Sequence, residues 1–343
     1  AKVYGVALKD RAAILPAGHA ANGAFWYDKS VAGFVTSSYY MDKLPDYVVK
    51  FNKQNTMKKG YDPKVHADGV TVTFDMAEAI MKAEKLGQNG TTDMLCVSIS
   101  STDAISHQTG TWCSPGKENE EVFLTLDRDM KKFFEALDAQ VGKGNYLVFL
   151  SADHGAMNNA RFLQDRRIPA GSWDGDAVAK KLNQTLAQEY PNVGDLVKTV
   201  MNYQVFFNRN IIKENKLDFA KIKQSVVDVL KEDSCVQYAC DMEKTMTESI
   251  PEDVKMRIVN GYNRERSGDV AIVLKPNYYA HGMKGTDHGE WNPYDTHIPL
   301  VFMGWGIQHG ATTRQTFMTD IVPTIAALLH VQAPNGCVGQ PIF

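Results

Sequence analysis

Short apolar runs and longer amphipathic stretches alternate along the first half of the chain. The runs at Val3–Leu8, Asp93–Ser100 and residues 145–150 have the length and apolar content of buried strands. Between them, Phe74–Lys85 and Val122–Val141 place apolar residues at helical spacing. This strand–helix–strand order predicts βαβ units and an α/β fold with a central, mostly parallel sheet between helices.

The pattern changes after Gly155, where loop-like stretches flank a mixture of helices and strands. This block predicts an inserted α+β lobe, a cap or lid over residues 156–290, on a core formed by residues 1–155 and 291–343. A final strand at Ile298–Gly304 and a helix at Asp320–His330 close the core. The lobe's expected elements are helices at Asp176–Tyr190, Asp218–Lys231 and Asp253–Asn260, and strands at Tyr203–Asn208, Val236–Cys240 and Val270–Leu274. In the core we expect a helix with a loop over Ala12–Asp28 and a helix over Tyr47–Asn52. The loops that flank the elements of the lobe are expected over residues 156–173 and 278–294.

Polar residues follow the apolar run 145–150 directly, as Ser151-Ala152-Asp153-His154-Gly155. In open α/β sheets, ligands collect outside the carboxyl ends of the strands. A carboxylate and an imidazole side by side there suit a divalent cation. Taken alone, Asp153 is better explained as a helix cap, and His154 as an ordinary loop histidine.

Two further stretches offer similar donors. Asp103 and His107 follow the run 93–100 at i, i+4 spacing, so a helix there would turn both side chains the same way. His297 precedes an apolar run. It is either a further metal ligand or a buried histidine that is hydrogen-bonded to a neighbouring carbonyl. Because His297 lies at the amino end of its strand, that strand must run antiparallel to the others, or the loop must fold back.

Lys9 and Arg11 follow the first predicted strand directly. They are either a solvated surface pair or a phosphate clamp, with the lysine as a point charge and the arginine as a fork.

Composition narrows the class of protein. The chain has 343 residues, 44% hydrophobic and 22% charged, with a net charge of −3, as in a soluble globular protein. It has no basic stripe for nucleic acid and no apolar run of about 18 residues that would form a membrane segment. Five cysteines lack zinc-finger spacing, and Cys235 and Cys240 are either a disulfide pair or free thiols.

Together these motifs resemble the alkaline phosphatase superfamily, and within it the bacterial phosphate monoesterases with a threonine nucleophile. The resemblance covers nearly the whole chain. It rests on Ala7 to His19, Ser101-Thr102-Asp103 with His107, Ser151 to Gly155, and Tyr294 to Leu300, in this order.

The resemblance implies a function and a set of site residues. Asp103, His107 and His297 match the three ligands of a first Zn²⁺, while Asp153 and His154 match two ligands of a second. Lys9 and Arg11 match the pair that binds the phosphoryl oxygens. Two cations can clamp the attacking and leaving oxygens of a phosphoryl transfer, so small phosphate monoesters are the expected substrates. His288 and His281 are alternative ligands, expected behind the others or lining the pocket.

In this family the nucleophile and a third ligand of the second Zn²⁺ lie upstream of the Lys-x-Arg element. Only eight residues precede Lys9, none of them Asp, Ser or Thr, and Ala1 is not a methionine. We therefore expect a fragment or a processed chain, with an incomplete second site and no activity by itself. The family also implies a periplasmic or secreted location, and nothing in the sequence indicates an oligomeric state.

Other functions remain open at this stage. A phosphodiesterase or nucleotide pyrophosphatase shares the two-zinc ligands, although Lys9 and Arg11 favour the more highly charged monoester. A sulfatase-type member is another alternative. A metal-binding or carbohydrate-binding domain without catalysis is the alternative from a different class.

Overall fold

The computed structural model describes residues 1–110, 118–280 and 282–343. These residues form two compact units, one of Ala1–Phe134 with Ala152–Ile298 and one of Glu135–Ser151 with Pro299–Phe343. All the site residues expected from the sequence that the structure describes belong to the first unit.

A four-stranded sheet organises the amino-terminal part of the first unit. Its order is β3-β2-β1-β4, and β1 pairs in parallel with both β2 and β4, whereas β3 is antiparallel to β2. The expected strands β1 and β4 are confirmed. The expected helix with a loop over Ala12–Asp28 is wrong in part, because the aromatic run Phe25-Trp26-Tyr27 lies in β2. The strands are β1 (Val3–Ala7), β2 (Gly23–Asp28), β3 (Gly33–Val35) and β4 (Met94–Ser98).

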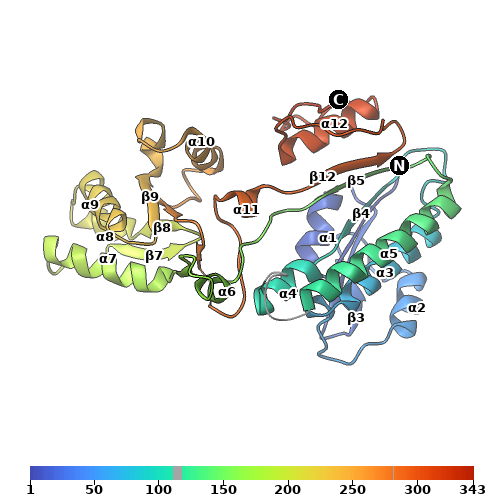
Figure 1. Cartoon of the computed structure of the whole chain (residues 1–343), viewed down its shortest axis with the longest axis horizontal. Helices are drawn as coiled ribbons and strands as arrows, with labels where there is room; N and C mark the ends of the chain where they lie inside the picture. Colours follow the sequence, from blue (N-terminus) through green and yellow to red (C-terminus); the bar gives the residue numbers. More distant parts are fainter. Residues whose placement is uncertain (111–117, 281) are drawn as a thin grey trace. The chain divides into compact units, whose positions relative to one another are not determined.

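Helices cover both faces of this sheet (Figure 1). Helix α1 packs closely on one face because β1 carries Gly5 there, and a Cβ at Gly5 would lie 2.1 Å from the carbonyl oxygen of Ala13. Helix α3 covers the other face, and Phe74 of α3 contacts Phe133 of α5 with ring centroids 5.3 Å apart. The helices of this part are α1 (Asp10–Ala17), α2 (Asp46–Gln54), α3 (Asp68–Ala83), α4 (Ser101–Thr109) and α5 (Glu118–Val141).

A second, antiparallel sheet lies in the same unit, in the order β7-β8-β10-β9. Strand β10 is buried along its whole length, and the apolar faces of α7 and α9 pack on the same core. The expected strands at 203–208, 236–240 and 270–274 are confirmed, and β7 is an additional one. The elements are α7 (Gly175–Glu189), β7 (Val197–Met201), β8 (Gln204–Phe207), α8 (Arg209–Glu214), α9 (Phe219–Lys231), β9 (Val236–Asp241), α10 (Glu252–Gly261) and β10 (Val270–Leu274).

The stretches expected as loops contain short elements. Strands β6 and β11 pair in parallel, so the backbone after Gly155 and the backbone after β10 run side by side. The four elements are α6 (Ala160–Gln164), β6 (Gly171–Ser172), β11 (Tyr278–Tyr279) and α11 (Pro293–Thr296).

The second unit contains β5 (Leu147–Ser151), β12 (Leu300–Gly304) and α12 (Ile321–Leu328). Here one expectation needs correction. Strand β5 pairs with β12 in an antiparallel two-stranded sheet, and its side chains are partly exposed, whereas a buried strand of a parallel sheet was expected. A two-stranded ribbon cannot bury both faces of its strands. The strand after His297 is antiparallel to β5, which is one of the two arrangements that the sequence left open.

Two general expectations can also be compared with the structure. Cys235 and Cys240 are free thiols, which settles the alternative left open by the sequence, and Cys113 lies outside the described residues. Within residues 1–110, 118–280 and 282–343, the helices are all too short or too polar to cross a membrane.

Candidate metal centre

Helix α4 places two donors on one face, as the sequence predicts. Asp103 lies in its first turn and His107 one turn later, and Asp103 Oδ1 is 3.1 Å from His107 Nε2. The carbonyl oxygen of Thr286 lies 3.0 Å from His107 Nδ1. Because a carbonyl oxygen can only accept, this contact favours a proton on Nδ1, and Nε2 is the nitrogen that faces Asp103 and could bind a metal in place of its proton.

A loop from a distant part of the chain brings in a third donor. Thr286 bonds its backbone N–H to the Ser106 carbonyl of α4 at 3.1 Å, and its hydroxyl donates to the Met157 carbonyl at 2.6 Å. The side-chain amide of Asn159 donates to three successive carbonyls, those of residues 283–285. These bonds hold the loop against α4, so that His288 follows two residues later beside the helix.

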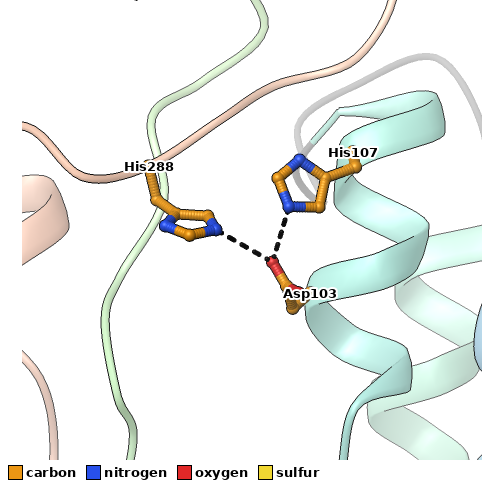
Figure 2. A group of neighbouring side chains, drawn as sticks. All are labelled: Asp103, His107 and His288. Carbon is orange, nitrogen blue, oxygen red and sulfur yellow. Dashed lines mark ion pairs between the residues drawn. The ribbon is translucent and has the colours of Figure 1, made fainter. Parts of the chain in front are cut away.

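The three donors converge (Figure 2). His288 Nε2 lies 3.6 Å from Asp103 Oδ1, and one ligand atom from each of Asp103, His107 and His288 lies within 4.8 Å of the others. One carboxylate oxygen and two imidazole nitrogens match the donor preference of Zn²⁺. The residues present therefore fit a metal ion of this kind.

The charges around the cluster favour cation binding. Burial alone would raise the pKa of Asp103, but hydrogen bonds from His107 and Lys9 outweigh it and hold that pKa well below its usual value. The hydrogen bond to Asp103 raises the pKa of His107. Burial, followed by the neighbouring His154, lowers the pKa of His288, so its imidazole stays neutral and can donate a lone pair.

Two other residues expected from the sequence lie at this centre. The Lys9 ammonium forms an ion pair with Asp103 Oδ2 at 2.5 Å. The His154 ring stacks on His288, with centroids 3.4 Å apart and planes tilted by 11°. The glycine after His154 allows a close approach to the backbone of residues 294–295, since a Cβ on Gly155 would lie 2.1 Å from the Tyr294 carbonyl oxygen.

Three expected residues do not join the cluster in the structure. Arg11 is exposed in the first turn of α1, and the Asp153 side chain is 87% exposed. His297 is exposed at the end of α11 and is not part of the three-donor group found among the described residues. Their roles as phosphate and metal ligands stay predictions, and His281 lies outside the described residues.

Sequence reasoning ranked His288 below His297, and the structure places His288 among the donors. The signal was present in Asp287-His288-Gly289, since an acid and a histidine stand together there as in Asp153-His154. Residues 287–289 also line a cavity of about 710 Å³, which sequence reasoning did not predict.

A family model described as "Type I phosphodiesterase / nucleotide pyrophosphatase" matches residues 2–300. Three curated relatives each align with 99% of this chain. Alkaline phosphatase PafA of Elizabethkingia meningoseptica is 39% identical over 71% of its own length. A protein of Myroides odoratus named calcium-transporting ATPase is 39% identical over 71% of its length. Alkaline phosphatase PhoV of Synechococcus elongatus is 40% identical over 70% of its length.

The crystal structure of wild-type alkaline phosphatase PafA superposes on all of this chain and on 74% of its own, with a TM-score of 0.93 and 38% identity. The chain therefore belongs to the type I phosphodiesterase / nucleotide pyrophosphatase family of the alkaline phosphatase superfamily. Within it, the chain is of the PafA type, which confirms the resemblance drawn from the motifs and the alkaline phosphatase-like α/β fold.

Proposed function

We propose that this protein hydrolyses phosphate monoesters of small molecules by a two-zinc phosphoryl-transfer mechanism. It is an alkaline phosphatase-type phosphomonoesterase by its relatives. The observation that carries the mechanistic part is the convergence of Asp103, His107 and His288 beside Lys9.

The first metal site is proposed on Asp103 and His107, with either His297, as the family resemblance implies, or His288, as the distances favour. The second is proposed on Asp153 and His154, whose ring already stacks on His288. Bound Zn²⁺ at these positions would act as a Lewis acid and stabilise charge on the attacking and leaving oxygens.

The chain's own cations are proposed to bind the phosphoryl group. Lys9 occupies the N-cap position of α1, and Arg11 follows in its first turn, so the helix dipole adds to their positive charge. The transferred group spreads negative charge over its equatorial oxygens, which Lys9 meets as a point charge and Arg11 as a fork. The identity of the nucleophile stays a prediction from the family, because no residue of the described cluster is proposed for that role.

The lobe of residues 156–290 is proposed as a cap on a core formed by residues 1–155 and 291–343. Its separate antiparallel sheet and its contribution to the cavity at His288 support this division. A periplasmic or secreted location is also proposed, on the family resemblance alone.

A second candidate activity is phosphodiester hydrolysis, favoured by the description of the family model that matches residues 2–300. The two activities differ in the charge of the transferred group. A monoester dianion benefits from both Lys9 and Arg11, whereas a diester carries one charge fewer.

The test is hydrolysis of a monoester and a diester with the same leaving group by the full-length enzyme. Lys9→Ala and Arg11→Ala should each lower kcat/KM for the monoester by about 10²-fold and affect the diester much less. Arg11→Lys should also lower the monoester rate, since an ammonium cannot replace a bidentate guanidinium. Equal losses on both substrates would favour the phosphodiesterase.

A further inference from the structure

A cavity of about 710 Å³ opens beside the candidate metal centre. Three stretches of chain form most of it, residues 172–176, 200–203 and 287–289. His288 therefore belongs both to the donor cluster and to the cavity wall. A phosphate ester with its phosphoryl group at the donors has this cavity available for the rest of the molecule.

A constrained hairpin fixes one wall. Asn202 and Tyr203 form the two-residue tip between β7 and β8, with φ of +50° and +57°. Positive φ at both tip residues is typical of a type I′ turn, and a bulky residue such as tyrosine is strained there. The Tyr203 hydroxyl donates to Glu290 at 3.0 Å and accepts from the Ala280 N–H at 3.1 Å, so both bonds hold the side chain in place.

The wall is aromatic. The Tyr203 ring lies 5.7 Å from the Trp173 ring, centroid to centroid. Trp173 is 6% exposed, and its indole N–H is buried with no hydrogen-bond partner among the described residues. A buried donor without a partner destabilises the fold, and a hydrogen bond to an acceptor would remove that cost.

The charged side chains of the cavity are acidic. They are Asp174, Asp176 and Asp287, and the described lining residues include neither lysine nor arginine. The amino end of α7 would ordinarily attract an anion. Here the Asp174 carboxylate already accepts from the N–H groups of Asp176 and Ala177, at 2.9 and 3.2 Å, so the chain supplies that anion itself.

Carboxylates beside aromatic rings form a suitable environment for an organic cation, which carboxylates attract and ring faces stabilise. An anionic group would meet like charge. We propose that this cavity receives the alcohol part of the phosphate ester and prefers alcohols bearing an ammonium group over neutral and anionic alcohols. The inference rests on the proposed phosphomonoesterase activity and adds the substrate class.

The experiment compares three monoesters with the full-length, zinc-loaded enzyme. Choline phosphate is cationic in its alcohol part, 3,3-dimethylbutyl phosphate is its neutral isostere, and the phosphate ester of 3-hydroxypropionate is anionic. The variant Asp174→Asn/Asp176→Asn removes two charges, and asparagine retains the capping role at residue 174. Its matched control is Glu252→Gln/Asp253→Asn, which removes two charges at the amino end of α10, outside the lining residues.

The cavity variant should lower kcat/KM for choline phosphate by about fivefold, the size of a weakly shielded cation interaction. It should change the neutral ester less than twofold and speed hydrolysis of the anionic ester. Because each substrate is compared with itself in two proteins, differences in leaving-group reactivity cancel. High salt should shrink the effect on the charged substrates only.

Binding of the alcohols alone gives a readout that needs neither metal nor turnover. Calorimetric titration of the metal-free protein should show choline binding, weakened about fivefold in the cavity variant and unchanged in the control. Choline that binds no better than 3,3-dimethylbutanol would overturn the inference, as would a cavity variant that lowers kcat/KM for choline phosphate no more than for the neutral ester. Absence of hydrolysis for all three esters would instead overturn the proposed function.

Discussion

Two clusters of polar and charged side chains in the same compact unit differ in how their charges are paired. Lys223 of α9 is 5% exposed, and its ammonium forms ion pairs with Asp241 at 2.7 Å and Glu243 at 3.2 Å. Each charge there has an opposite charge from the same chain. The cluster of Asp103, His107 and His288 instead brings three possible metal ligands together, and Lys9 is the only lysine or arginine among the described residues that forms an ion pair with it.

The difference separates a structural from a functional use of polar residues. Burial would lower the pKa of Lys223, but Asp241 and Glu243 outweigh the effect of burial and raise that pKa. The cluster therefore stabilises the charged form of Lys223 without any further ion. The three-donor cluster is partly exposed and lies beside a cavity, so a cation could reach it from solvent. Polar density alone therefore does not indicate a site, and the convergence of possible metal ligands beside a cavity is what distinguishes the proposed one.

The largest expected effect is on folding, through the structural cluster. Lys223→Met should lower the free energy of unfolding by about 3 kcal/mol or more, because it leaves the Asp241 carboxylate buried without its cation. Urea unfolding of the metal-free protein measures the loss. Zinc affinity should be unchanged, since the variant does not touch the donors.

Two further variants sharpen this result. Lys221→Met, on the same helix but exposed, should change the unfolding free energy by less than about 0.5 kcal/mol. Lys223→Met/Asp241→Asn should recover part of the loss, because the buried charge is gone while asparagine keeps the cap on the following turn. No recovery in the double variant would show that the methionine packs badly rather than that a charge is stranded.

The cluster of Asp103, His107 and His288 should respond in the opposite way, with a large change in zinc affinity and a small change in the free energy of unfolding. Asp103→Asn should weaken zinc binding at the tightest site by about 10²-fold, because it removes the anionic ligand and the first site forms from residues within this chain. Unfolding without metal should change much less than in Lys223→Met. Competition with a chromophoric chelator measures the affinity, and Asp127→Asn, an exposed acid on α5, is the control.

Equal zinc affinity in wild type and Asp103→Asn would remove Asp103 from the ligand set. Two equally tight sites, or none, in the wild-type titration would contradict the distinction between a first and a second site.

Parts of this comparison could be foreseen from the sequence. The spacing of Asp103 and His107 predicts their shared face, because helix geometry is local. The donor at His288 could not be ranked in the same way. Its position depends on Thr286 and Asn159 binding backbone groups far away in the chain, and such contacts leave no periodic signal. Strand β2 was missed for a related reason, since its three aromatic residues gain a strand environment from the neighbouring β1 and β3.

A smaller effect should identify the third ligand. His288→Asn is expected to weaken binding at the tightest zinc site by about tenfold, and His297→Asn much less, because His288 is the imidazole within reach of Asp103. Chelator competition on the two single variants gives the order directly. If His297→Asn is the more damaging, the ligand set implied by the family resemblance holds, and His288 lies beside the metal without binding it.

The smallest expected effect is the response of the structural cluster to alkaline pH. The pKa of Lys223 is raised above its ordinary value of 10.5 in the folded protein. The proton is therefore held more tightly by the folded chain than by the unfolded one, and the resulting stabilisation is complete below pH 10.5. It is lost as the pH rises through the folded-state pKa. The stability gap between wild type and Lys223→Met should thus be constant from pH 8 to about 10 and narrow above that, while the gap for Lys221→Met stays flat. Urea unfolding across this range measures both. A gap that stays constant at high pH would mean that Lys223 stabilises the lobe through its aliphatic stem rather than through its charge.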